Sequence, residues 1–170
     1  MFDKYKLFRG FAYTLEILVL YVLQETPSLF MAVSGIRPVL IISAAVTIAI
    51  LENQNIGFGF GAFCGILMDI GSGGLIGFNA LFLSVLCYFV GLAAVDYIKT
   101  NIITAFICSI ISVFLLLSIH FIFFYVFKSY SSAGYAYFKH YLPMMFYAVL
   151  PTPILYLLNK ALALFGRERA

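Results

Sequence analysis

The sequence predicts an all-α integral membrane protein, a compact bundle of about six transmembrane helices, with five as the alternative count. Hydrophobic residues make up 64% of the 170 residues and charged residues only 10%, whereas a soluble domain has roughly 45–50% and about 25%. Apolar segments recur along the whole chain between short polar or glycine-rich turns. A membrane-spanning helix needs about 20 residues, so we expect one integral membrane domain over residues 1–170.

The first expected helix covers about residues 11–23. Glu16 interrupts its apolar run, and no small-residue cleavage pattern follows, so a retained span is favoured over a cleaved signal peptide. The segment 28–35 is short, apolar and rich in small residues, and we interpret it as a loop, a turn or a re-entrant segment. The second helix begins near Arg37-Pro38, where proline suits a first helical turn, and ends near Glu52.

Four further helices are expected. The third covers about residues 56–69, and the fourth continues from the glycine turn after it to about Val95. The longest apolar run, 102–127, is the fifth helix. The sixth covers about 141–164, and two prolines, Pro151 and Pro153, are expected to kink it.

Six spans place both chain ends on one side of the membrane. Cytoplasmic loops carry an excess of Lys and Arg, and this arrangement puts seven of the ten basic residues on that side. Both termini are therefore expected in the cytoplasm. The seven are Lys4, Lys6, Arg9, Lys99, Lys160, Arg167 and Arg169, and the other three are Arg37, Lys128 and Lys139.

Three glycines, Gly57, Gly61 and Gly65, follow each other at four-residue spacing and are followed at the same spacing by Asp69. Residues four apart share one face of a helix, and small residues let helix backbones approach closely in a membrane. The stripe is a candidate helix-packing or partner-binding face. A neighbouring helix of the same chain and a separate protein are both open as the occupant.

Four polar residues in apolar surroundings are candidate intramembrane sites: Glu16, Asp69, Asn79 and His120. A charge near the bilayer centre costs at least about 2.5–3.5 kcal/mol, so such residues usually face the protein interior and mark function. Asp69 has a structural interpretation as well, because it precedes a glycine turn and could accept hydrogen bonds from amides near Gly77 and Asn79.

These residues are too sparse for a proton or cation relay, and His120 is most simply a core residue hydrogen-bonded to a backbone or hydroxyl group. The two histidines form no metalloprotease motif, and the three cysteines form no CxxC pair. We therefore expect no catalytic activity, no cofactor and no metal site. The weak positive charge and its position also argue against nucleic acid as a partner.

Several of these features together resemble one protein family. Gln24 closes a first span, Arg37-Pro38 opens a second, and the glycine run Gly57, Gly61 and Gly65 ends at Asp69 before Gly77. This arrangement, with the length and the number of spans, is similar to the MreD family of rod shape-determining membrane proteins.

The resemblance implies a non-enzymatic scaffold subunit of the elongation complex (elongasome) in the bacterial inner membrane. Its implied partners, besides membrane lipid, are an MreC-like bitopic protein and, directly or indirectly, the MreB filament and RodA with its transpeptidase. The implied role is regulation of cell shape and lateral peptidoglycan synthesis. An alternative is a vitamin-binding subunit similar to the S components of energy-coupling-factor transporters, with the tyrosine-rich segment 128–140 as a lid.

Overall fold

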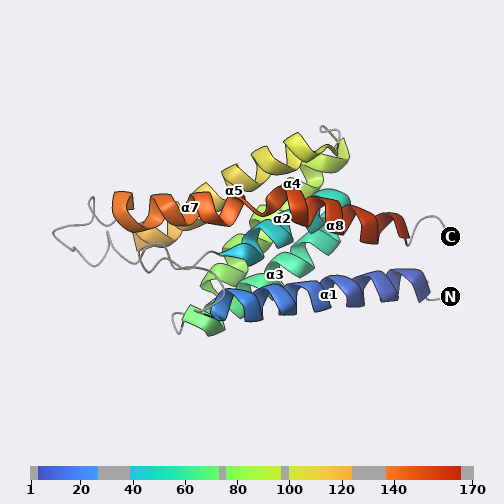
Figure 1. Cartoon of the computed structure of the whole chain (residues 1–170), viewed down its shortest axis with the longest axis horizontal. Helices are drawn as coiled ribbons and strands as arrows, with labels where there is room; N and C mark the ends of the chain where they lie inside the picture. Colours follow the sequence, from blue (N-terminus) through green and yellow to red (C-terminus); the bar gives the residue numbers. More distant parts are fainter. Residues whose placement is uncertain (1–3, 27–38, 73–75, 97–99, 124–136, 166–170) are drawn as a thin grey trace.

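The computed structural model describes residues 4–26, 39–72, 76–96, 100–123 and 137–165, and their regular structure is entirely helical. Figure 1 shows the helices side by side in one bundle, with the start of α1 and the end of α8 at the same end of it. The predicted all-α membrane bundle is confirmed. In chain order the elements are α1 Lys4–Glu25, α2 Leu40–Leu51, α3 Gln54–Ser72, α4 Phe78–Asp96, α5 Ile102–Phe121, the π-helical turn η3 Tyr137–Tyr141, α7 Leu142–Val149 and α8 Thr152–Phe165.

Four segments of the described residues are long and apolar enough to cross a membrane: Leu7–Glu25, Phe78–Val95, Ile102–Phe121 and Leu142–Leu164. The last of these combines α7 and α8. The α2 helix has only 12 residues, or about 18 Å at 1.5 Å per residue, which is shorter than the hydrocarbon core. The α3 helix has 19 residues but carries glycines and polar ends.

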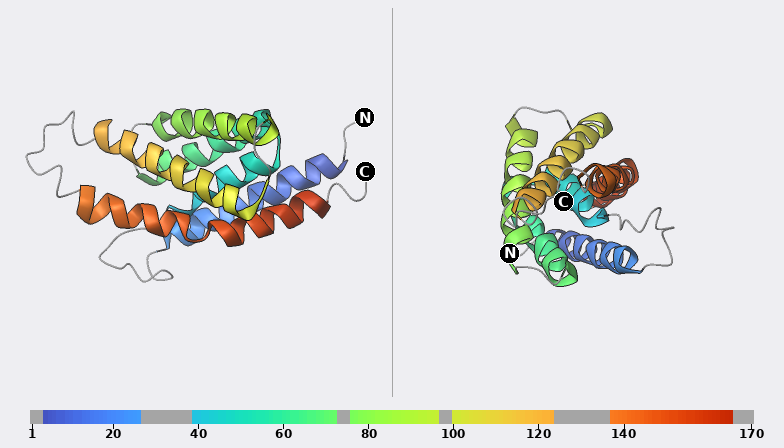
Figure 2. Two further views of the ribbon diagram at one scale, coloured as in Figure 1. Left: turned by 90° about the horizontal axis from the view of Figure 1, so that it is seen from above. Right: turned by 90° about the vertical axis from the view of Figure 1, so that its left-hand side faces the viewer.

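The short α2 helix lies at the centre of the bundle. Residues 40–50 are all buried, and α2 contacts α1, α3, α4, α5, α7 and α8. Figure 2 shows it enclosed by the other helices. A helix that is apolar on all sides can lie in a protein core or face lipid, and α2, with only 12 residues, is too short to span the bilayer at the lipid boundary.

The outer helices present their remaining apolar side chains outward. Leu7, Phe11 and Val22 of α1 and Ile103 and Phe114 of α5 are examples, each at least half exposed. In water such surfaces would aggregate, but in a bilayer they contact lipid tails of equal polarity. The apolar exterior and the buried α2 together describe a multi-pass membrane protein.

The glycine stripe of α3 packs against α4 of the same chain. A Cβ added at Gly61 would lie 2.9 Å from both the Leu83 carbonyl oxygen and the Ser84 Cα, and one at Gly65 would overlap the backbone of Ala80. Real Cβ atoms do not approach backbone so closely, so only glycine permits this contact. The two backbones therefore touch directly along the antiparallel α3–α4 pair.

The α2 helix joins the same contact through one alanine. A Cβ at Gly57 would lie 2.9 Å from the Ala49 Cβ, and a Cβ at Gly91 of α4 would lie 3.2 Å from the Ala49 carbonyl oxygen. Ala49 itself is fully buried. Small residues on three helices thus let α2, α3 and α4 meet at one point.

The structure divides the expected sixth helix into two helices, α7 and α8, where the sequence predicted one kinked helix. The α7 helix ends at Val149 and α8 begins at Thr152. Pro151 and Pro153 both lack the N–H that a continuous helix needs. Ser43 of α2 donates a hydrogen bond to the Ala148 carbonyl oxygen beside the break, which replaces backbone pairing in the apolar interior.

Other boundaries also differ from the sequence prediction. The α3 helix is longer at both ends than the expected 56–69, and the α-helical part of α5 ends at Phe121. The predictions for the segment 28–35, for Arg37-Pro38 and for most of the loop 128–140 lie outside the described residues.

The α3–α4 contact predicts that the same substitution destabilises the protein at one glycine of α3 and not at another. Gly65→Ala is expected to lower the free energy of unfolding by about 1–3 kcal/mol, because its methyl group overlaps α4 backbone. Gly59→Ala is the matched control, because a Cβ there meets nothing within 4 Å; it should leave the stability unchanged or raise it by up to about 1 kcal/mol. Reversible unfolding in mixed micelles measures both, and equal effects would contradict the contact.

Candidate functional site

The polar residues singled out in the sequence do not converge on one place. Asp69, Asn79 and His120 lie near one end of the bundle, where α3 ends and α4 begins, whereas Glu16 lies near Asn159 in the middle of α8. The glycines of the stripe on α3 contact α4 and α2. The arrangement therefore supports interhelical contacts rather than a single reaction centre.

Asp69 caps the start of α4. Its carboxylate accepts hydrogen bonds from the backbone N–H groups of Gly77 at 2.8 Å, Asn79 at 3.1 Å and Ala80 at 3.3 Å, and the residue is only 2% exposed. Gly77 has a φ of +100°, a conformation that L side chains rarely adopt. Free amides at a helix N-terminus stabilise a negative charge, so the carboxylate is compensated where it is buried.

His120 and Asn79 belong to the same end of the bundle. The His120 Nδ1 lies 3.2 Å from the Tyr141 hydroxyl oxygen, and the His120 and Phe78 rings form a T-shaped pair with centroids 6.0 Å apart. Asn79 is 5% exposed, and its backbone N–H is one of the donors to Asp69. These contacts connect α3, α4, α5 and η3.

A buried ion pair at the opposite end was not singled out from the sequence. The Arg9 guanidinium of α1 donates to both carboxylate oxygens of Glu52, at 2.8 Å from Nε and 2.9 Å from Nη2. The Tyr13 hydroxyl donates to the same carboxylate at 3.0 Å. Bidentate Arg–carboxylate pairing is strong and geometrically specific, so this contact fixes α1 against the end of α2.

One sequence signal could have found this pair. In a six-span topology the start of the first helix and the end of the second lie on the same side of the membrane. An arginine and a glutamate placed there have opposite charges at equal depth. The pair is 43 residues apart, so no local motif reveals it.

A polar cavity of about 330 Å³ lies beside Glu52. Lys160 of α8 lines it and has its ammonium 5.8 Å from the centre of the Tyr156 ring, while the Tyr156 hydroxyl donates to the Thr100 carbonyl oxygen at 2.9 Å. The cavity is therefore at the end of the bundle where α1 begins and α8 ends. Its lining combines one carboxylate, already paired, with one ammonium group.

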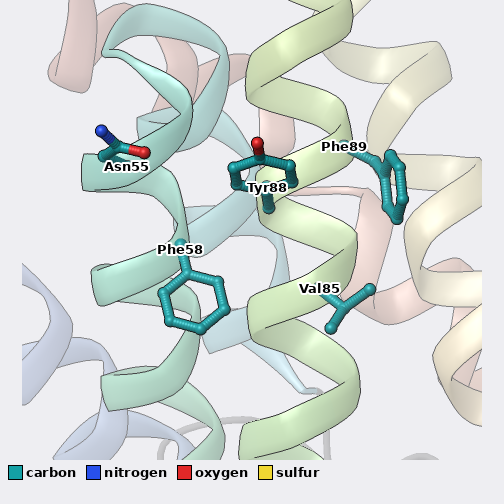
Figure 3. A pocket seen from close by; sticks show the side chains of 5 residues that line it. All are labelled: Asn55, Phe58, Val85, Tyr88 and Phe89. Atoms are coloured by element: carbon teal, nitrogen blue, oxygen red, sulfur yellow. The ribbon is translucent and has the colours of Figure 1, made fainter.

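An open cleft of about 580 Å³ lies on the outer side of the α3–α4 pair. Figure 3 shows Asn55 and Phe58 on α3 and Tyr88 on the front of α4, while Val85 and Phe89 lie on the side of α4 that is turned away from α3. The Phe58 and Tyr88 rings meet edge to face with centroids 6.5 Å apart. Because its walls are α3 and α4, the shape of this cleft depends on the glycine contact behind it.

Comparison with known proteins identifies one family. A family model described as rod shape-determining protein MreD matches residues 4–162, nearly the whole chain. The search of curated proteins and the search of solved structures each gave no match. Among the described residues there is also no cluster of three or more His, Cys, Asp or Glu side chains that could hold a metal ion.

The ion pair predicts a large loss when only one partner is removed. Arg9→Met is expected to lower the free energy of unfolding by about 3–5 kcal/mol, because it leaves the Glu52 carboxylate buried without its counter-charge. Adding Glu52→Gln to that variant should recover much of the loss, since the buried charge is then gone. A double-mutant cycle of unfolding in mixed micelles measures the coupling, and additive effects of the two substitutions would contradict the pairing.

Proposed function

We propose that this chain, which belongs to the MreD family of rod shape-determining proteins, is a non-enzymatic inner-membrane subunit of the bacterial elongation machinery. The family match covers residues 4–162, so a role in determining rod shape concerns the whole membrane bundle. The finer proposal is that the chain acts by assembly. Its partner is an MreC-like bitopic protein, with the MreB filament and RodA with its transpeptidase contacted directly or indirectly.

The observation that carries this proposal is the family match, and the α3–α4 pair supports it as a scaffold. The glycine stripe, offered by the sequence as a partner face, is covered by α4. A partner helix would have to displace α4 to reach it. We therefore assign the glycines an indirect role, in which they hold two helices at a fixed distance so that the outer surfaces keep their shape for assembly.

No feature of the described residues favours the transporter-subunit alternative. The large clefts on α3–α4 and between α5 and α7 are lined mostly by apolar and aromatic side chains. A vitamin site needs several polar groups that converge to fix the orientation of the ligand. A thermal-shift screen with vitamins separates the two functions, because strong stabilisation by one vitamin would support transport.

The assembly role predicts that a wedge between α3 and α4 weakens the complex. Gly61→Leu is expected to reduce co-purification of an MreC-like protein and to impair the rescue of rod shape in cells depleted of their own MreD, because the leucine side chain overlaps α4 backbone. Gly59→Leu should behave as the wild type, since that position is open. Membrane fractions should contain both variants, which separates loss of assembly from loss of insertion. Unchanged recovery of the partner with Gly61→Leu would contradict this role.

We also propose that the end of the bundle holding the start of α1 and the end of α8 faces the cytoplasm (Figure 1). Lys160 lines the cavity beside the Arg9–Glu52 pair, so both basic side chains lie at that end, as the positive-inside rule requires. A green fluorescent protein fused to the C-terminus should fluoresce, whereas alkaline phosphatase fused there should be inactive. The reverse pattern would overturn this orientation.

A further inference from the structure

Three buried carboxylates of this bundle have different surroundings. Asp69 accepts three backbone N–H groups, and Glu52 accepts Arg9 and Tyr13. Glu16 differs, because both of its carboxylate oxygens are buried and neither has a hydrogen-bond partner. An ionised carboxylate without donors is very costly to bury, and the usual outcome is that the group becomes neutral.

The group beside Glu16 is also incompletely paired. Asn159 of α8 lies next to the Glu16 carboxyl group, is 0% exposed, and has a buried Oδ1 without a hydrogen-bond partner. Its Nδ2 donates to the Thr47 hydroxyl of α2 at 2.9 Å. The unsatisfied acceptor atoms of Glu16 and Asn159 therefore belong to two neighbouring side chains in the apolar interior.

The orientation of the Asn159 amide follows from Thr47. The single hydroxyl proton of Thr47 is directed to backbone carbonyl oxygens of its own helix, those of Ser43 and Ala44, both at 2.9 Å. Thr47 can therefore only accept from Asn159, so the Asn159 nitrogen must point toward it. This leaves Asn159 with its Oδ1 and one further N–H for another partner.

We propose that Glu16 is a proton-binding site, held as a neutral carboxylic acid that pairs with the Asn159 amide. The added proton makes Glu16 a donor to the Asn159 Oδ1, while the Glu16 carbonyl oxygen accepts the second amide N–H. One proton thus satisfies both unpaired groups. The pair connects α1 to α8, and through Thr47 to α2.

The other ionisable groups around Glu16 supply no compensating positive charge. Tyr13 of α1 and Cys64 of α3 lie within electrostatic range of it, and neither group carries positive charge in any protonation state. Arg9, on the same helix, is engaged by Glu52. Among the described side chains of α1, only Tyr13 and Ile17 are hydrophobic and fully buried. The pair of Glu16 and Asn159 is therefore a substantial part of the contact between α1 and the rest of the bundle.

Dicyclohexylcarbodiimide tests this proposal, because it reacts with neutral carboxylic acids in apolar surroundings. The acid O–H adds across one C=N bond, with the oxygen bonding to the central carbon and the proton moving to nitrogen. The adduct then rearranges to an N-acylurea with no leaving group. Mass spectrometry of the full chain in micelles at pH 7 should find one carbodiimide on Glu16. Glu52 and Asp69 serve as internal controls and should be unmodified.

Infrared spectroscopy provides the second and deciding measurement. At pH 7 the wild type should show a carbonyl band of a protonated carboxylic acid that is absent in Glu16→Gln. Asn159→Leu should shift that band, since the acid loses its amide partner, whereas a purely structural role of Asn159 would leave the band unmoved. If no such band depends on Glu16, the carboxyl group is ionised at pH 7, and the proposal is overturned. Neither measurement involves a partner protein, so a failure of the proposal for Glu16 can be distinguished from a failure of the proposed assembly role.

Discussion

Direct contact between the backbones of α3 and α4 is the constraint on which the rest of the bundle depends. At Gly61 and Gly65 no side chain separates the two helices, so their distance is set by main-chain atoms rather than by flexible side chains. Ala49 of α2 then fits against Gly57 and Gly91. Since α2 is enclosed by the remaining helices, its position in turn determines where α1, α5, α7 and α8 can pack.

Three polar groups inside this bundle are compensated in three different ways. Backbone amides at a helix start surround Asp69, and a bidentate arginine neutralises Glu52. Ser43 supplies a hydroxyl donor at the break between α7 and α8, where the prolines lie. In a membrane none of these groups can rely on water, which explains why polar contacts between helices occur where the apolar packing has a break or an end.

Much of the fold could be predicted from the sequence because membrane helices carry strong local signals. The apolar runs located the helices, and the position of Asp69 before Gly77 indicated a capping role. The occupant of the glycine stripe could not be predicted, because a small-residue pattern permits close approach of any helix, whether from the same chain or another. The Arg9–Glu52 pair was missed for a related reason, since it depends on how two distant segments align in space.

We expect the α3–α4 contact to stay closed when a partner protein binds. Spin labels at Ile66→Cys and Leu81→Cys, two exposed positions on the facing helices, report the separation directly, with Cys108 replaced by serine and the buried Cys64 and Cys87 retained. We expect one short distance in lipid that does not change when an MreC-like partner binds. A longer distance in the complex would mean that the partner inserts along the glycine stripe, and it would contradict a closed α3–α4 contact.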